Sequence, residues 1–239
     1  YVYAYAKLLQ NGEIREGEEI NVTVPTGNFG NILAAYYEKQ MGIPIAKLIC
    51  ASNENKVLFD CFQTGTYDKN RKFVLTTSPS MVFLVSSNLE RLIYLICGED
   101  SEKTKELMEE LKTTGKYTIT LEMKEKLADF AAGYSTEEET AESIHDTYQK
   151  TGYVMDTHTA VAAHVCGQYR AKSGDQTKCV IASTASPYKF VKSVMSAIDA
   201  ENANADEFDL LPKLQEVSGV PMPQAIKDIL DAIDRFVYY

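Results

Sequence analysis

Two spacings of apolar residues alternate along the chain, and together they predict an α/β fold. A short run rich in β-branched residues occupies 20–25, and the runs 47–51 and 179–183 are typical of buried strands. Helical spacing follows the first and the last of these runs, at 32–41 and 190–198. The order strand, turn, helix, strand is a βαβ unit, whose strands are parallel and whose crossover is right-handed. We therefore expect a mostly parallel sheet with covering helices.

The remaining segments have mainly helical spacing. A first helix is predicted to end at 11–12, an Asn-Gly pair of the kind that terminates helices. The stretch 86–96 has an apolar stripe at helical spacing, with Ser87 or Asn88 as its cap. The run 73–77 is predicted as a short strand. Further predictions are helices over 53–62, 158–169, 209–217 and 224–236, and a polar loop over 202–206.

The composition changes over 99–142, where charges are dense and β signals are few. We interpret this stretch as a helical insertion, with the acidic run 137–139 at a solvated helix start. A metal site or a cationic-partner site is the functional alternative for that run. The chain then divides into three parts: one part of a large α/β domain (1–98), the helical insertion (99–152), and the rest of the large domain with C-terminal helices (153–239).

Charge and length narrow the classes of function. The 239 residues suffice for one large domain or two small ones, and 24 basic residues face 34 acidic ones, for a net charge of -10. This balance argues against a protein that neutralises nucleic-acid phosphates and against docking on an anionic membrane. No apolar run approaches the ~20 residues that cross a bilayer. A small anionic ligand stays compatible, because it needs only a local pocket.

The cysteines and the first residues indicate the compartment and the extent of the chain. Five cysteines, an odd number with no CxxC pair, lie mostly in apolar stretches, so we predict buried free thiols. Without a signal peptide, the expected compartment is the cytosol. Helical spacing begins at Tyr1 with no cap before it, which predicts a chain cut out of something longer.

The strongest candidate for chemistry is the turn that follows the first predicted strand. It comprises Gly27, Asn28, Phe29, Gly30 and Asn31, and its two glycines allow positive φ and a close ligand approach. Successive N–H groups in such a turn, with the positive end of the next helix, form a nest that suits a phosphate group. A tight turn that binds nothing is the alternative. The sequence of the turn matches neither GxxxxGK[ST] nor GxGxxG.

Two further polar segments follow predicted strands. Thr184, in the segment 183–187, offers a neutral hydroxyl, and ligands of open α/β sheets bind beyond the carboxyl ends of strands. The alternative is a helix cap at Thr184 or Ser186. Asn53 and Asn55 follow the second strand, where their side chains either enter the same crevice or cap the next helix.

The three histidines, His145, His158 and His164, are interpreted as structural. The last two are six residues apart, which does not place them on one helix face as zinc ligands, and no HExxH is present. The sequence has no GxSxG and no persuasive nucleophile–base pairing, so no metal is predicted.

Several blocks, taken in order, resemble threonine synthase, the enzyme of threonine biosynthesis that uses pyridoxal 5′-phosphate (PLP). The match covers about residues 1 to 230, and the ordered set is far more specific than any one block. The blocks are Val24–Ala34, Met41–Ile49, Ser52–Asn55, Ser78–Met81, Ser86–Leu92, Asp156–Val161 and Ser183–Phe190.

This resemblance implies a tryptophan-synthase-β type of fold, a three-layer αβα domain with a mostly parallel sheet. It implies that the loop from Gly27 to Asn31 holds the PLP phosphate, that Thr184 hydrogen-bonds the pyridine nitrogen, and that Asn53 and Asn55 contact substrate. The reaction of the family converts O-phospho-L-homoserine and water to L-threonine and phosphate, with PLP as the electron sink.

The sequence departs from the family at three points. The lysine that forms the family's Schiff base, in a Ser-Phe-Lys-Asp-like segment, lies upstream of everything present, so no catalytic residue is assigned and the isolated chain is predicted to be inactive. Val82-Phe83 replaces a usual Asp-Ile, and Ser186 replaces a frequent His. The alternatives are a non-catalytic phosphate- or PLP-binding module and another PLP lyase of the same fold, such as a dehydratase.

Overall fold

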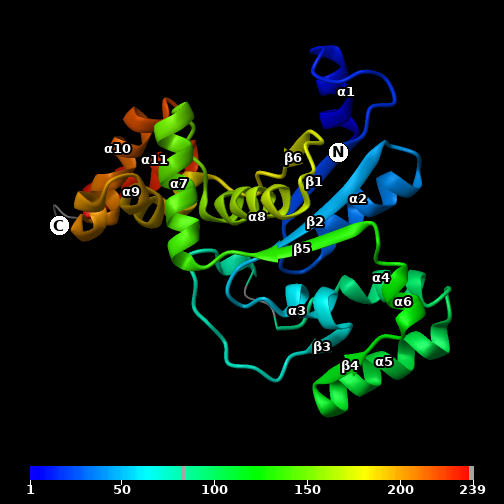
Figure 1. Cartoon of the computed structure of the whole chain (residues 1–239). Helices are drawn as coiled ribbons and strands as arrows, with labels where there is room; N and C mark the ends of the chain where they lie inside the picture. The colour runs from blue at the N-terminus through cyan, green and yellow to red at the C-terminus, as the bar shows by residue number, and fades with distance from the viewer. Residues whose placement is uncertain (82–83, 237–239) are drawn as a thin grey trace.

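A parallel four-stranded sheet forms the centre of the computed structural model, which describes residues 1–81 and 84–236 (Figure 1). The strands lie in the order β5-β2-β1-β6, and every neighbouring pair is parallel. This confirms the parallel sheet expected from the βαβ pattern. The strands are β1 (Ile20–Pro25), β2 (Ile45–Ser52), β5 (Phe130–Tyr134) and β6 (Cys179–Ile181).

Helices cover both faces of the sheet, which gives the three-layer αβα architecture. Alternate residues of β2 define the two faces. Leu48 and Cys50 pack into a core with α2 (Gly30–Gln40) and α3 (Val57–Thr64), whereas Ile49 and Ala51 pack against α8 (Thr157–Ser173). Because α8 crosses all four strands, its first turn lies beside the carboxyl ends of β1 and β6.

Two groups of helices flank the sheet. One, with a small antiparallel ribbon, consists of α4 (Leu89–Ile96), α5 (Ser101–Thr114), α6 (Leu121–Glu125), β3 (Thr66–Asp68) and β4 (Lys116–Thr118). The other has its own apolar core and consists of α7 (Glu137–Thr151), α9 (Val191–Ile198), α10 (Glu207–Ser218) and α11 (Gln224–Phe236). The helix α1 (Val2–Gln10) and the 3-10 segments Pro79–Met81, Pro187–Phe190 and Ala200–Asn204 complete the order.

The stretch 99–152, predicted as a helical insertion, is mostly helical but also contains two strands that were not predicted. This stretch contributes β4 and β5, and β5 joins the main sheet beside β2. The sequence of β5 is Phe-Ala-Ala-Gly-Tyr, and small residues are poor strand formers, so the strand has almost no local signal. The structure requires a small residue at Gly133, since a Cβ there would lie 2.7 Å from Cγ1 of Val165 on α8.

The predicted strand at 73–77 is also absent from the structure. The backbone of Val74 pairs instead with a side chain, because the Asn55 amide donates to its C=O (2.8 Å) and accepts from its N–H (2.9 Å). The same use of Asn55 delays the helix expected from residue 53, which begins at Val57. The loop expected at 202–206 lies largely in a 3-10 turn.

Most other predicted elements are confirmed within a few residues. The first helix ends at Gln10 with Asn11 as its C-cap, and helices occupy the predicted stretches near residues 86, 158, 190, 209 and 224. All five cysteines are free, and three of them are buried: Cys50, Cys61 and Cys166. Across residues 1–81 and 84–236, no helix is both long enough and apolar enough to cross a membrane.

Candidate functional site

A cavity of about 340 Å³ opens at the carboxyl ends of β1 and β6. The loop from Gly27 to Asn31 forms one wall, and Thr184 and Ala185 form another. The structure therefore brings together two segments that the sequence separates by more than 150 residues, as strand ends in a parallel sheet are expected to do. Ser80, Met81, Asn88, His158 and Lys189 complete the lining.

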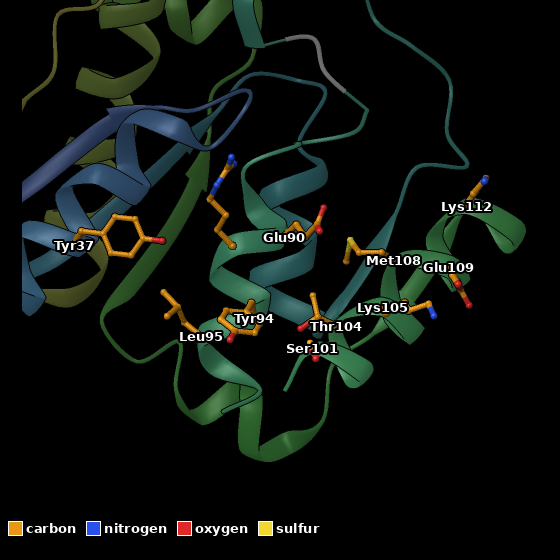
Figure 2. A pocket seen from close by; sticks show the side chains of 11 residues that line it. Tyr37, Glu90, Tyr94, Leu95, Ser101, Thr104, Lys105, Met108, Glu109 and Lys112 are labelled. Atoms are coloured by element: carbon orange, nitrogen blue, oxygen red, sulfur yellow. The ribbon is translucent and has the colours of Figure 1, made fainter. Parts of the chain in front are cut away.

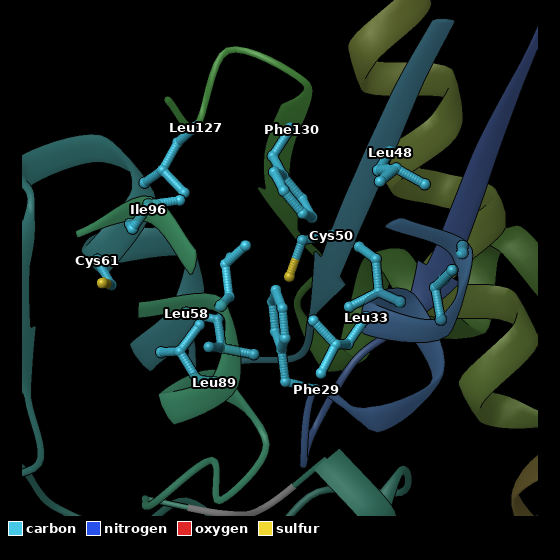
Figure 3. Close-up of a cluster of buried hydrophobic side chains, with 14 of the residues drawn as sticks. Phe29, Leu33, Leu48, Cys50, Leu58, Cys61, Leu89, Ile96, Leu127 and Phe130 are labelled. Carbon is cyan, nitrogen blue, oxygen red and sulfur yellow. The ribbon is translucent and has the colours of Figure 1, made fainter. Parts of the chain in front are cut away.

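The sharp turn of the loop is made at Phe29. This residue has φ 63°, in the left-handed region, whereas neither Gly27 nor Gly30 has positive φ. The expectation that the glycines supply the left-handed conformation is therefore wrong. Burial fixes the conformation of Phe29, because its ring is 1% exposed and lies 6.2 Å from the ring of Phe62. The ring of Phe130 lies 6.0 Å from it, and Figure 3 shows both rings within the core.

Gly30 serves close packing instead. A Cβ at this position would lie 3.2 Å from Nδ2 of Asn88, which approaches the loop from the start of α4. The absence of a side chain thus lets a second segment contact the loop backbone directly.

The loop presents unused hydrogen-bond donors to the cavity. Among the described residues, none of the backbone N–H groups from Gly27 to Asn31 donates to a protein acceptor, while the N–H of Thr26 just before them donates to Ala51 O. The N-terminus of α2 follows at Gly30 and adds the positive end of an eleven-residue helix. Adjacent donors without protein acceptors at the start of a helix suit an anion with several oxygens.

Thr184 lies across the cavity from this loop and is exposed. The capping role that competed for it is taken by Ser186, whose Oγ accepts from the N–H of Tyr188 (3.3 Å) at the start of the 3-10 segment. The hydroxyl of Thr184 is therefore available to a ligand. Ser186, which stands where the family often has His, thus still caps the segment that follows it. The other departure from the family, Val82-Phe83, lies outside the described residues.

Asn53 and Asn55 do not line the cavity, and the structure gives both another role. The amide of Asn53 donates to Thr76 Oγ1 (2.9 Å) and Ser78 Oγ (3.1 Å), and its oxygen accepts from the N–H of Asn55 (3.0 Å). Both residues are almost completely buried. The sequence correctly placed them after a strand, but their amides hold the segment 74–78 and are not free to contact a substrate.

His158 is one of several lining residues that sequence reasoning did not assign to the site. Its Nε2 accepts from the N–H of Ser80 (3.1 Å), and its Nδ1 lies 3.2 Å from Oδ1 of Asp156. The ring is 2% exposed and packs 4.9 Å from that of Phe190. His158 is structural, as expected, but it forms part of the cavity wall. The available signal was its position two residues after a helix-capping Asp.

Asp156 organises this wall. Its carboxylate caps α8 by accepting from the N–H groups of His158 and Thr159, and the Thr159 hydroxyl bonds both to it and to Ser183 Oγ (3.2 Å), next to Thr184. Burial opposes ionisation, but the hydrogen bonds from His158 and Thr159 outweigh it and hold the pKa of Asp156 below its usual value. The charged carboxylate thus connects α8 to the end of β6.

The other candidate residues lie outside the cavity. His145 bonds Ala197 O through Nδ1 (3.2 Å), and His164 lies 3.5 Å from Glu139. The acidic run begins α7 as predicted but is not simply solvated: Glu137 accepts from the N–H of Thr77 (2.8 Å), and Glu139 forms a capping box with Thr136. Within the described ranges, no group of three or more acidic, His or Cys side chains is arranged to hold a metal ion.

A larger cavity of about 630 Å³ lies between α4 and α5 (Figure 2). Its lining includes Tyr94, Leu95 and Met108, and it contains none of the residues predicted to carry chemistry. The site at the strand ends is therefore the better candidate, because two independent polar segments converge there.

Comparisons with known proteins identify the family. Residues 159–237 match the family model described as "Threonine synthase, C-terminal". Human "Threonine synthase-like 1" is 41% identical over 220 residues, which are 91% of this chain and 29% of that protein. The chain belongs to the threonine synthase family. It resembles the structure of PLP-bound threonine synthase from Brucella melitensis with a TM-score of 0.75 and 38% identity, over 82% of this chain and 41% of that one.

The threonine synthase structure from yeast overlaps more of the chain. It matches with a TM-score of 0.78 and 32% identity, over 97% of this chain and 50% of that one. The chain thus spans half or less of the length of these relatives. The α/β fold predicted from the threonine synthase blocks is confirmed.

Proposed function

We propose that this chain supplies the phosphate-binding part of a PLP-dependent threonine synthase. The observation that carries the proposal is the convergence on one cavity of the N–H groups from Gly27 to Asn31 and the hydroxyl of Thr184, none of which has a partner among residues 1–81 and 84–236. A PLP molecule has a phosphate group at one end and a ring nitrogen elsewhere on its periphery. The cavity offers a fitting partner for each.

In this proposal the loop backbone and the N-terminus of α2 bind the PLP phosphate. The hydroxyl of Thr184 donates to the pyridine nitrogen, and because it is neutral it leaves that nitrogen largely unprotonated. When bound, PLP supplies the electron sink for carbanion chemistry. Asp156 and His158 hold the wall of the cavity that carries Ser80 and Ser183.

The proposed overall reaction is that of the family: O-phospho-L-homoserine and water give L-threonine and phosphate. The isolated chain is proposed to be inactive, because the lysine with which the family attaches the cofactor has no match among its lysines. No nucleic acid or membrane takes part, and the cytosolic location predicted from the sequence belongs to the same proposal.

Two assays on the isolated chain test this function together. The chain is expected to bind pyridoxamine 5′-phosphate, an analogue that forms no imine with lysines, and Thr184→Val is expected to weaken this binding by roughly ten-fold, the value of one hydrogen bond to a polar ligand. Ser173→Ala, which removes a hydroxyl at the far end of α8, is the control. With PLP and O-phospho-L-homoserine, the chain should release no threonine. Threonine production by the chain alone would contradict the proposed division of the active site.

A non-catalytic binding module is the second candidate, and the missing lysine match favours it. Borohydride reduction with PLP tests the premise that both candidates share, that this chain has no cofactor lysine of its own. A single stoichiometric lysine adduct would show that the chain carries its own cofactor lysine, and Lys189, which lines the cavity, is the first position to inspect. The proposal predicts only scattered trace labelling.

A further inference from the structure

A short segment that packs against the loop, Ser86, Ser87 and Asn88, forms hydrogen bonds to two carbonyl groups of the loop. Asn88 also reaches the cavity, whereas Ser86 and Ser87 do not line it. Ser86 Oγ donates to Gly27 O (2.9 Å), and Asn88 donates to Asn28 O through both Nδ2 (2.8 Å) and its backbone N–H (3.3 Å). The Asn28 side chain is held as well, since its Oδ1 accepts from Ser87 N–H (2.7 Å) and Ser87 Oγ (2.8 Å). We call residues 86–88 the latch.

The latch determines where the loop N–H groups point. In a trans peptide the C=O of one residue and the N–H of the next point in opposite directions. Because Gly27 O points toward the latch, the N–H of Asn28 in the same peptide points away from it. In the next peptide Asn28 O points toward the latch, so the N–H of Phe29 also points away from it. Two donors face away from the latch, and two carbonyl oxygens that would repel a phosphate are kept out of its reach.

The latch is itself anchored in the ribbon formed by β3 and β4. The Tyr67 hydroxyl accepts from the N–H of Ser86 (2.8 Å) and donates to Leu84 O (3.0 Å). The Tyr67 ring is 1% exposed and stacks on that of Tyr117, with centroids 5.5 Å apart and planes within 4°. Because a buried, stacked ring is held in one position, the hydrogen bonds of its hydroxyl fix where the latch lies relative to the loop.

We propose that Tyr67, Ser86 and Ser87 are positioning residues for phosphate recognition, which act by orienting the peptides of Gly27 and Asn28 and not by touching the ligand. This inference rests on the proposed function, because it concerns the same loop. It adds that the selectivity of the cavity for a phosphorylated ligand is set by a segment outside the loop, and that this dependence extends to β3 and β4.

A pair of ligands tests the inference. Pyridoxamine 5′-phosphate and pyridoxamine differ only in the phosphate group, so the ratio of their dissociation constants measures phosphate recognition. Ser86→Ala and Tyr67→Phe are each expected to lower this ratio by roughly ten-fold, while binding of pyridoxamine changes little. Tyr117→Phe removes the hydroxyl from the other ring of the stack, and Ser101→Ala removes one from the start of α5; both should keep the wild-type ratio. A variant that weakens both ligands equally, or an unchanged ratio in folded Ser86→Ala and Tyr67→Phe, would overturn the inference.

A second readout needs no ligand and separates this inference from the proposed function. In the amide spectrum of the 15N-labelled, ligand-free chain, Ser86→Ala and Tyr67→Phe should broaden or split the signals of Asn28 and Phe29, and Tyr117→Phe should not. If wild type binds neither ligand, the proposed function fails, and this spectrum still decides the role of the latch. Unaltered loop signals in both latch variants would contradict it.

Discussion

Phe29 shows how a single residue stores strain at the site. A left-handed conformation costs a residue with a side chain about 1–2 kcal/mol, and Phe29 adopts it because its ring is buried with Phe62 and Phe130. The left-handed conformation creates the turn in which the loop N–H groups have no acceptor in the described part of the chain. No sequence rule would place positive φ on a Phe between two glycines, which is why the sequence predicted the loop but not its geometry.

The strain at Phe29 predicts that a Gly variant is more stable than an Ala variant, although Ala is usually the less damaging replacement. Phe29→Ala should lower the free energy of unfolding by about 3–5 kcal/mol, because the buried ring is lost while the strain stays. Phe29→Gly loses the same ring but relieves the strain, so it should be more stable than Phe29→Ala by about 1 kcal/mol. Urea denaturation monitored by circular dichroism measures both values. A more stable Ala variant would show that position 29 is not left-handed.

Asp156 gives a prediction about pH. Its hydrogen bonds from His158 and Thr159 lower its pKa in the folded state, so the ionised form contributes stability above the unfolded value of about 3.9 and loses it as pH falls further. Asp156→Ala should cost about 1–2 kcal/mol near pH 7, the usual range for a lost N-cap. The difference from wild type should shrink below about pH 4. A difference that is constant from pH 7 to pH 3, in urea titrations at each pH, would contradict this account.

At the scale of elements, the strands that carry the site could be predicted, whereas β3, β4 and β5 could not. The apolar runs of β1, β2 and β6 have strong local signals, and the rule that ligands bind at strand ends placed Gly27 and Thr184 together. β5 consists mainly of small residues, and its assignment depends on contacts with β2 and α8 that lie far away in the sequence. The contributions of Asn88 and His158 also depend on such contacts.

The packing of β5 against α8 can be tested by a rescue. Gly133→Ala brings a Cβ to 2.7 Å from Val165 Cγ1, so Val165 must shift, and overpacking of this kind costs about 1–3 kcal/mol. Val165→Ala removes the obstructing methyl groups, and the double variant should recover part of the loss relative to additive effects. A double-mutant cycle of unfolding free energies checks this coupling. Strict additivity would show that the two residues are not in contact.

At the scale of the whole molecule, the site joins parts of the chain that fold into different layers. The loop follows β1, Ser80 lies in a 3-10 turn, His158 begins α8, and Thr184 follows β6. A ligand that contacts all of them stabilises the folded chain by mass action. At about 100 times its dissociation constant, pyridoxamine 5′-phosphate should therefore add about 2.7 kcal/mol to the free energy of unfolding. Pyridoxamine at the same concentration should add much less, and equal stabilisation by the two would contradict phosphate recognition.

The central claim is that the cavity at the ends of β1 and β6 binds the cofactor through the loop and Thr184. The most direct measurement is a titration of the 15N-labelled chain with pyridoxamine 5′-phosphate, followed through assigned amide signals. The account predicts saturable shifts that are largest from Gly27 to Asn31 and at Thr184, with the cavity between α4 and α5 unaffected. Saturable shifts confined to Tyr94 and Met108, or no saturable shifts in the loop, would contradict it.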